Sequence, residues 1–187
     1  TLSITDIESV ASVTAPDAFD GVHMNADYFS DGAGAHGKPN MRSYVGGGSG
    51  VFGVINGWYH VASGHFDTCL VVAEEKMSSA FPHPQGAFNA IYDQFLERPL
   101  GVNLLWIFAL EMNRYMHAHN IPMESFARVA QKNKRNGIYH PSSQAGIAGD
   151  YTIRQIMDSE VMAWPVQRLM VSPISDGGAA VVLVSEE

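Results

Sequence analysis

The stretch Gly46–Ser78, GGGSGVFGVINGWYHVASGHFDTCLVVAEEKMS, decides the fold class of this chain. Three consecutive glycines open it, and apolar residues then recur at helical spacing from Val51 to Val61. Gly64 is placed to end that helix. The run Thr68–Ala73 is short, continuous and rich in β-branched residues, which is typical of a buried strand. A glycine turn, a helix and a buried strand in succession predict an α/β fold.

The flanking sequence adds elements of the same style. We expect a strand at Ile7–Val13, a long loop over Asp17–Asn40, helices over Leu100–His119, Met123–Asn136 and Tyr151–Ser159, a turn at Ser175–Gly178 and a second buried strand at Ala179–Ser185. The helix over Leu100–His119 is apolar on most sides, so we expect it to be central. A strand near each end of the chain suggests one half of a larger sheet protein.

The bulk composition limits the function classes. The formal net charge of −8 would repel a polyanion, so we expect no nucleic-acid partner. Cys69 is the single cysteine, which excludes a disulfide within the chain and favours a reducing compartment. No apolar run is long enough to span a bilayer and no signal-peptide pattern opens the chain. We therefore expect a cytoplasmic protein without a membrane partner.

The glycine-rich turn is the strongest candidate site. Gly46, Gly47, Gly48 and Gly50 allow backbone to approach a ligand closely, and the following helix would direct unpaired N–H groups at the same point. Such a turn could stabilise the oxyanion of a thioester, or it could serve packing alone. Ser49 within it is either the N-cap of the helix or a nucleophile or hydrogen-bond donor.

Other candidate motifs are weaker. Lys132, Lys134 and Arg135 form either a solvated helix face or a contact to a phosphorylated ligand. The glycine spacing at residues 32–37 imitates a dinucleotide fingerprint, but no helix is expected to follow, so we expect no nucleotide site. No histidine pair has the spacing of a helical zinc site, so we expect no metal. Cys69 lies in an apolar strand and is expected to be inert packing.

This combination resembles the central segment of thiolases, which have a cysteine followed by Gly-Ser-Gly, a helix, a Gly-Asp-like turn, a buried strand and a Glu-x-Met-Ser segment. The matching positions are Gly48–Gly50, then Ser63, Gly64 and Asp67, and then Glu75–Ser78. Phe81–His83 resemble the Pro-His that often follows, while Phe126–Asn136, His140, Pro141 and Pro173–Leu183 resemble later segments of the first half of the family.

The resemblance implies a layered αβα domain built on a mixed five-stranded sheet. Residues 1–187 would form a thiolase-like N-terminal domain, without the family's first strand–helix unit and its whole C-terminal domain. The substrate would be an acyl-CoA, with coenzyme A as part of the substrate and no other cofactor. A homodimer or hetero-oligomer is implied, with a chain that supplies the C-terminal half as one candidate partner.

The main departure from the thiolase pattern is Gly47, which stands at the position of the nucleophilic cysteine. Thiolase chemistry needs a thiolate to accept the acyl group, and glycine cannot supply one. Thiolase-like aldolases of sterol side-chain breakdown also lack this cysteine. They carry Gly-Gly-Gly there, cleave a β-hydroxyacyl-CoA by a retro-aldol reaction and work with a DUF35-type OB-fold partner. Gly46–Gly48 resemble that turn.

Three functions follow as alternatives. The first is a carbon–carbon lyase acting on a CoA thioester, the second a non-catalytic scaffold or binding subunit, and the third a conventional thiolase. For an enzyme, the candidate catalytic positions are Gly47, Gly48, Ser49 and His83. The candidate substrate-binding positions are Gly46, Gly50, Lys132, Lys134 and Arg135.

Overall fold

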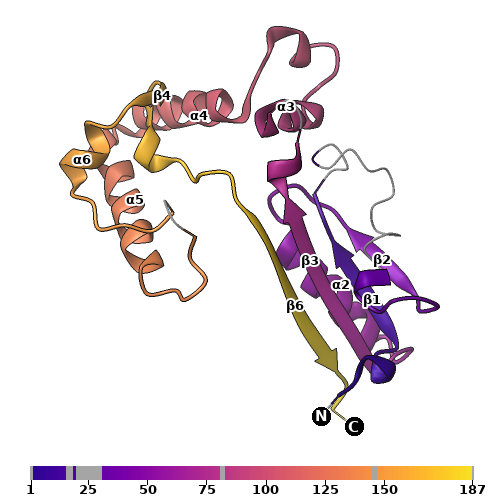
Figure 1. The fold of residues 1–187 in the computed structure, drawn as a ribbon. Coiled ribbons are helices and arrows are strands. Elements are labelled where there is room, and N and C mark those ends of the chain that lie inside the picture. Colours follow the sequence, from indigo (N-terminus) through magenta and orange to yellow (C-terminus); the bar gives the residue numbers. More distant parts are fainter. Residues whose placement is uncertain (1, 16–18, 20–30, 81–82, 145–146, 187) are drawn as a thin grey trace. The chain divides into compact units, whose positions relative to one another are not determined.

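A computed structural model describes residues 2–15, 19, 31–80, 83–144 and 147–186. The chain divides into two compact units (Figure 1). One unit comprises Thr1–Pro84 with Asp176–Glu187, and the other comprises Gln85–Ser175. We call them the sheet unit and the helical unit. Most of the loop expected over Asp17–Asn40, and Phe81 and Pro82 of the family motif, lie outside the described residues. A single domain over residues 1–187 stays a prediction.

The sheet unit is built on a mixed four-stranded sheet. Its strands are β1 (Ser9–Val13), β2 (Asn40–Ser43), β3 (Thr68–Lys76) and β6 (Asp176–Val184). They lie in the order β2-β1-β3-β6, in which β1 runs parallel to β2 and β3, and β6 runs antiparallel to β3. The α/β class and the mixed sheet are therefore confirmed. The count of five strands is wrong for the described residues, which form four in this sheet.

Helix α2 (Ser49–Ala62) packs on one face of this sheet through its glycines. A Cβ added at Gly53 would lie 2.1 Å from Val13 Cγ2, and one added at Gly57 would lie 2.4 Å from Val71 Cγ2. Only glycine permits an approach this close. Beneath the helix, Ala11, Val13, Cys69 and Val71 form a buried cluster.

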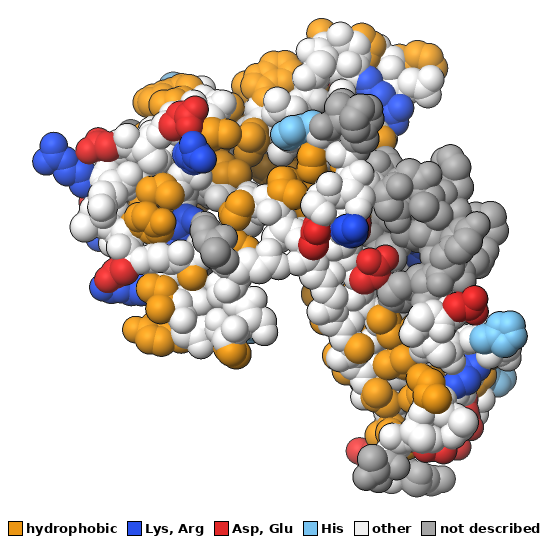
Figure 2. Space-filling model, viewed as in Figure 1, with side chains coloured by type: hydrophobic (Ala, Val, Ile, Leu, Met, Phe, Trp, Pro, Cys, Tyr) orange, Lys and Arg blue, Asp and Glu red, His pale blue; other side chains and the backbone are white. Residues whose placement is uncertain are grey.

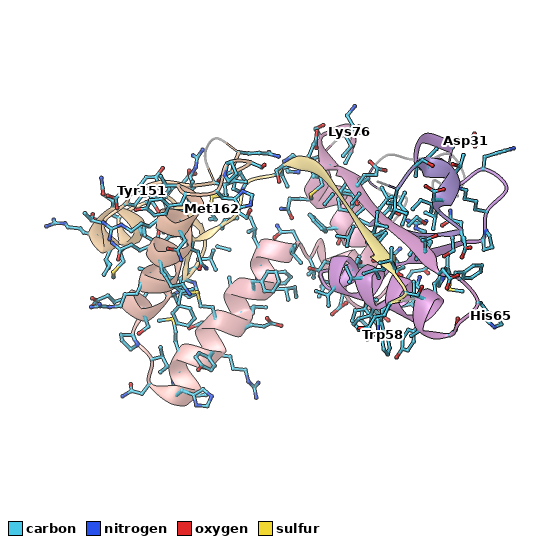
Figure 3. All side chains as sticks on the ribbon, turned by 90° about the horizontal axis from the view of Figure 1, so that it is seen from below. Asp31, Trp58, His65, Lys76, Tyr151 and Met162 are labelled. Carbon is cyan, nitrogen blue, oxygen red and sulfur yellow. The ribbon has the colours of Figure 1, made fainter. Side chains whose placement is uncertain are left out.

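The apolar side chains of α2 lie mainly on its outer side. Val51 is 67% exposed and Trp58 56% exposed, while the buried residues of the helix are Gly53, Gly57 and His60. Figure 3 shows Trp58 on the side of α2 that faces away from the sheet. The apolar periodicity therefore predicted the helix correctly, but glycines rather than apolar residues contact the sheet.

The opposite face of the sheet carries a smaller cluster of Ile7, Val10 and Ala35, with Leu70 packed against it. Strand β6 forms the sheet edge beside β3, and most of its residues are exposed. Hydrophobic side chains are visible over the strands of this unit in Figure 2. The prediction of a strand near Ala179–Ser185 is confirmed, but it is not buried, and Asp176–Gly178 extend it instead of forming a turn.

The helical unit contains the remaining longer elements. These are α3 (Pro84–Phe88), α4 (Leu104–His119), α5 (Met123–Gly137), α6 (Ile153–Met157) and a hairpin of β4 (Val161–Ala163) and β5 (Val166–Gln167), apart from Pro84, the first residue of α3, which belongs to the sheet unit. Short 3-10 turns occupy Ile4–Asp6 and Met77–Ser79 in the sheet unit. Three more occupy Asn89–Ile91, Arg98–Leu100 and Arg168–Met170 in the helical unit. The expected central position of α4 is wrong within the described residues, because Ala109 is its only buried residue. None of the described helices is both long and apolar enough to cross a membrane.

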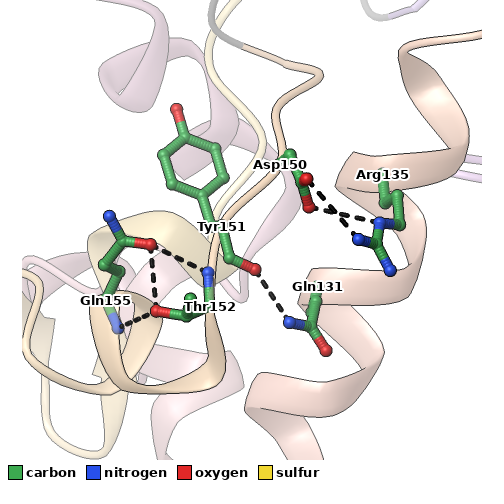
Figure 4. A network of polar contacts seen from close by, with 6 residues as sticks. All are labelled: Gln131, Arg135, Asp150, Tyr151, Thr152 and Gln155. Carbon is green, nitrogen blue, oxygen red and sulfur yellow. Dashed lines mark hydrogen bonds and ion pairs between the residues drawn. The ribbon is translucent and has the colours of Figure 1, made fainter.

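Helix α5 and the start of α6 are joined by the polar network drawn in Figure 4. Gln131 Nε2 donates to the carbonyl of Tyr151 over 2.8 Å, and Arg135 pairs with Asp150 at 3.2 Å. Thr152 caps α6, and its side chain and that of Gln155 exchange hydrogen bonds with backbone in a capping box. Thr152 is therefore the N-cap of α6.

Candidate functional site

A cavity of about 390 Å³ lies at the edge of the sheet where α2 begins. Strands β1 and β3 are parallel, so their C-terminal ends meet at this edge, and the antiparallel β6 starts there. The lining residues are Val13, Thr14 and Ala15, then Gly46, Ser49 and Gly50, then Ala73, Glu74 and Glu75, and finally Gly177, Gly178 and Ala179. In open α/β sheets, this is where ligands bind.

The glycine turn is shaped by positive φ and by the Ser49 hydroxyl. Gly46 has a φ of +60°, which favours glycine. Ser49 Oγ accepts from the N–H of Val45 at 3.0 Å and donates to the carbonyl of Gly46 at 2.6 Å. Gly48 occupies the N-cap position, so the expectation that Ser49 caps the helix is wrong. Ser49 instead fixes the turn, and both of its hydrogen-bonding roles are engaged there.

Gly47 lies in this turn without crowding. A Cβ added to it would meet no atom within 4 Å, and the same holds for Gly50. At Gly48 an added Cβ would make an ordinary contact with Phe52, at 3.5 Å. Packing does not therefore require glycine at residue 47, so a side chain could stand at this point beside the cavity.

Hydrogen bonds made by two side chains hold the part of the cavity wall that is formed by the ends of β1 and β3. The N–H of Ala15 donates to Glu75 Oε2 at 2.7 Å, and Arg42 Nη2 donates to the carbonyl of Ala15 at 2.6 Å. At the end of β3, the N–H and hydroxyl of Ser78 both donate to the carboxylate of Asp176. These hydrogen bonds lower the pKa of Asp176. The ends of β1, β3 and β6 are thereby tied together around the cavity.

The sequence-predicted residues are brought together only in part. Gly46, Ser49 and Gly50 line the cavity, and Gly47 and Gly48 lie in the same turn. His83 belongs to the sheet unit, but it is exposed and is not among the lining residues. Lys132, Lys134 and Arg135 lie on α5 of the helical unit.

Two of the three candidate basic residues of α5, Lys134 and Arg135, have partners within their unit. Lys134 is 9% exposed, and its Nζ donates to the carbonyl of Ile147 at 3.1 Å and lies 5.8 Å from the centre of the Tyr151 ring. Arg135 pairs with Asp150. Lys132 is exposed. The interactions of Lys134 and Arg135 favour a role in packing the helical unit.

His60 of α2 and Cys69 of β3 form a buried pair between helix and sheet, with 3.8 Å between Sγ and Nδ1. Burial raises the pKa of the Cys69 thiol and lowers the pKa of the His60 imidazole. Both groups are thus held in their neutral forms, as expected for inert packing. In the described part of the chain, no group of three His, Cys, Asp or Glu side chains could hold a metal ion.

Sequence reasoning missed the strand-end residues of the site. Glu75 and Gly177 are part of the family motifs alone, Val13 is the last residue of an expected strand, and the sequence assigns no role to Thr14 and Ala15. The parallel pairing of β1 and β3 brings the C-terminal ends of both strands to the same edge as the glycine turn. That common edge is the signal that could have identified them.

The fold and the site define a class: a thiolase-like α/β chain with a glycine-rich turn at the start of its sheet-covering helix. No family model matches the chain. It is 32% identical over 154 residues to an acetyl-CoA acetyltransferase of Methanothermobacter thermautotrophicus, a match that covers 82% of the chain and 39% of the relative. It is 31% identical over 103 residues to a steroid side-chain-cleaving aldolase of Thermomonospora curvata, covering 55% of the chain and 26% of the relative.

Comparison with solved structures supports the same fold. The Ltp2-ChsH2(DUF35) aldolase superposes with a TM-score of 0.73 at 20% identity, over 99% of the chain and 46% of that structure's chain. This likeness shows the fold. The chain spans about two fifths of the length of the acetyltransferases that it matches. Sequence and structure thus confirm the resemblance to the thiolase superfamily.

Proposed function

We propose that the chain forms the thioester-binding part of an acyl-CoA enzyme that cleaves or forms a carbon–carbon bond. The observation that carries this proposal is the cavity at the start of α2. Its 390 Å³ lie in the range of small-ligand sites and would accommodate the thioester end of an acyl-CoA. The N-terminus of α2 places the positive end of the helix dipole at this cavity, and Ser49 and Gly50 of its first turn are lining residues.

The reaction that we propose is of the aldolase type. Gly47 stands at the position of the thiolase nucleophile, so this residue can accept no acyl group. In a retro-aldol cleavage of a β-hydroxyacyl-CoA, a base takes the hydroxyl proton, the Cα–Cβ bond breaks, and an aldehyde or ketone leaves. The resulting thioester enolate is then protonated at Cα. The start of α2 would stabilise the negative charge on the enolate oxygen.

The similarity to a steroid side-chain-cleaving aldolase supports this choice of reaction. We further propose that the chain acts in a homodimer or a hetero-oligomer, with the general base contributed by a chain supplying a thiolase-like C-terminal half. A DUF35-type subunit is a candidate third component, since the aldolase with the similar fold is described as a DUF35 complex. We also propose a role in lipid or sterol metabolism and a cytoplasmic location.

A conventional thiolase is the second candidate, because the acetyltransferase match covers more of the chain than the aldolase match. Turnover by the assembled enzyme separates the two. The aldolase should release an aldehyde or ketone from a β-hydroxyacyl-CoA without free coenzyme A. If the assembly instead acts only on a β-ketoacyl-CoA together with free coenzyme A, the aldolase proposal is wrong.

A further inference from the structure

The candidate cavity owes its room to small side chains at the ends of β3 and β6. Val71 and Leu183 mark the face of these strands that packs on α2, since an added Cβ at Gly57 would lie 2.4 Å from Val71 Cγ2 and 3.1 Å from Leu183 Cδ1. Alternate residues of a strand share one face, so Ala73 and Ala179 continue this face toward the start of α2. Both residues line the cavity.

The pairing of the two strands places further small residues on the same side. Strand β6 runs antiparallel to β3, with Ala179 opposite Ala73 and Gly177 opposite Glu75. Opposite residues of an antiparallel pair point to the same face, so a side chain at residue 177 would point to the cavity side. A Cβ added there meets no atom within 4 Å. Backbone and a single methyl group therefore form the β6 side of the cavity, where Gly177, Gly178 and Ala179 are the lining residues.

The neighbouring Glu75 side chain extends away from β6. The N–H of Ala15 donates to Glu75 Oε2 over 2.7 Å. Ala15 lies just beyond the end of β1, which is on the other side of β3 from β6. The side chain of Glu75 is therefore held toward β1, and the space over Gly177 stays open. The room on the β6 side thus depends on the small residues of β6 itself.

We infer that Gly177 and Ala179 set the size of the acyl group, so that the cavity selects acyl groups larger than acetyl. This inference rests on the proposed thioester site and names its substrate class. One water molecule takes up about 30 Å³ of liquid, so the three heavy atoms of an acetyl group would fill roughly a quarter of the 390 Å³ cavity. A larger acyl group would bury more apolar surface against Val13, Ala73 and Ala179.

Two uncharged thioesters of different size test this inference. The acyl group of 3-methylbutanoyl-CoA has three more carbons than that of acetyl-CoA. Isothermal titration calorimetry with the full chain should give at least about tenfold tighter binding of 3-methylbutanoyl-CoA, because additional methyl and methylene groups are buried. In Ala179→Leu this preference should fall to about threefold or less, with acetyl-CoA affinity changed by less than about twofold, because the new side chain occupies only the space of the larger group.

Ala180→Leu is the matched control. Ala180 is the next residue of β6, is exposed and pairs with Val72, so its side chain points to the opposite face and is not among the lining residues. It adds the same apolar side chain to the same strand and should keep the preference of the unsubstituted chain. Gly177→Val should act like Ala179→Leu, because its side chain would enter the same open space. Urea unfolding midpoints show whether any of these substitutions has disturbed the fold.

The possible failures are distinguishable. If neither thioester binds to the unsubstituted chain, the thioester site itself is wrong, and the size selection falls with it. If both bind with equal affinity, or if Ala179→Leu and Gly177→Val keep the tenfold preference, the site stands and the role of β6 is refuted. Equal loss of affinity for both thioesters in these variants, or an equal loss of preference in Ala180→Leu, would likewise overturn the inference.

Discussion

Replacing Gly57 by alanine should force α2 away from the sheet. The new Cβ would lie 2.4 Å from Val71 Cγ2 and 3.1 Å from Leu183 Cδ1, whereas carbon atoms in good contact are about 3.5–4.0 Å apart. Val71 and Leu183 belong to the neighbouring strands β3 and β6, so relief requires movement on two sides. Overpacking of this kind costs about 1–3 kcal/mol, against a gain of about 1 kcal/mol from the better helix propensity of alanine.

Gly50→Ala provides the matched control on the same helix. An added Cβ there meets no atom within 4 Å, so only the propensity gain remains. The difference in unfolding free energy between the two variants, about 1–3 kcal/mol, therefore largely isolates the packing cost.

Urea unfolding followed by Trp58 fluorescence measures this difference within the sheet unit. The background should carry Trp106→Phe and Trp164→Phe, because these two of the three tryptophans lie in the helical unit. Equal midpoints for Gly57→Ala and Gly50→Ala would refute the claim that α2 packs through its glycines.

Three further substitutions test the turn, the strand ends and the helical unit. Gly47→Cys should be tolerated, because an added Cβ at this position has open space. The new thiol should react faster with iodoacetamide than Cys69, because burial raises the pKa of the Cys69 thiol. Peptide mass spectrometry compares labelling at the two sites, and preferential labelling of Cys69 would contradict this prediction. Ser78→Ala should lower stability at neutral pH but much less in acid. Hydrogen bonds from Ser78 lower the pKa of Asp176 in the folded state. Their contribution to stability is therefore present above the ordinary Asp pKa of 3.8 and is lost as the pH falls through the lower pKa of the folded state. The difference in urea midpoint between Ser78→Ala and the unsubstituted chain should be smaller at pH 2 than at pH 7. Thr152→Ala should cost about 1 kcal/mol through loss of the α6 cap, measured by thermal unfolding, and an unchanged midpoint would contradict it.

The local periodicity of the sequence was enough to predict most elements but not their burial. Spacing from Val51 to Val61 gave α2, and the apolar run from Thr68 gave β3. The predictions of burial were wrong because an apolar residue does not by itself specify which face of a helix or strand packs against the core. In α2 the close approach to the sheet depends on Gly53 and Gly57, whose lack of a side chain gives no hydrophobic signal.

The candidate site was predictable where it depends on local sequence and unpredictable where it depends on strand pairing. Gly46 and Ser49 could be assigned to a turn before a helix from their neighbours alone. Glu75 could not be placed opposite them, because its position depends on the pairing of β3 with β1 and on the hydrogen bond from Ala15. Strand β2 was missed altogether, since its four residues include Asn40, Arg42 and Ser43 and lack an apolar pattern.

The missing nucleophile bears on the reaction more than on the binding geometry. The start of α2 is positioned by its close packing at Gly53 and Gly57 and by the Ser49 hydrogen bonds in the turn, and none of these contacts involves a side chain at residue 47. The start of α2 would therefore keep its place whether residue 47 is glycine or cysteine. Loss of the thiol removes acyl transfer through this residue, while stabilisation of an oxyanion depends on backbone that the substitution leaves intact. In the aldolase that we propose, this single difference would change the reaction while the glycine turn keeps its position, and another chain of the proposed assembly would supply the general base.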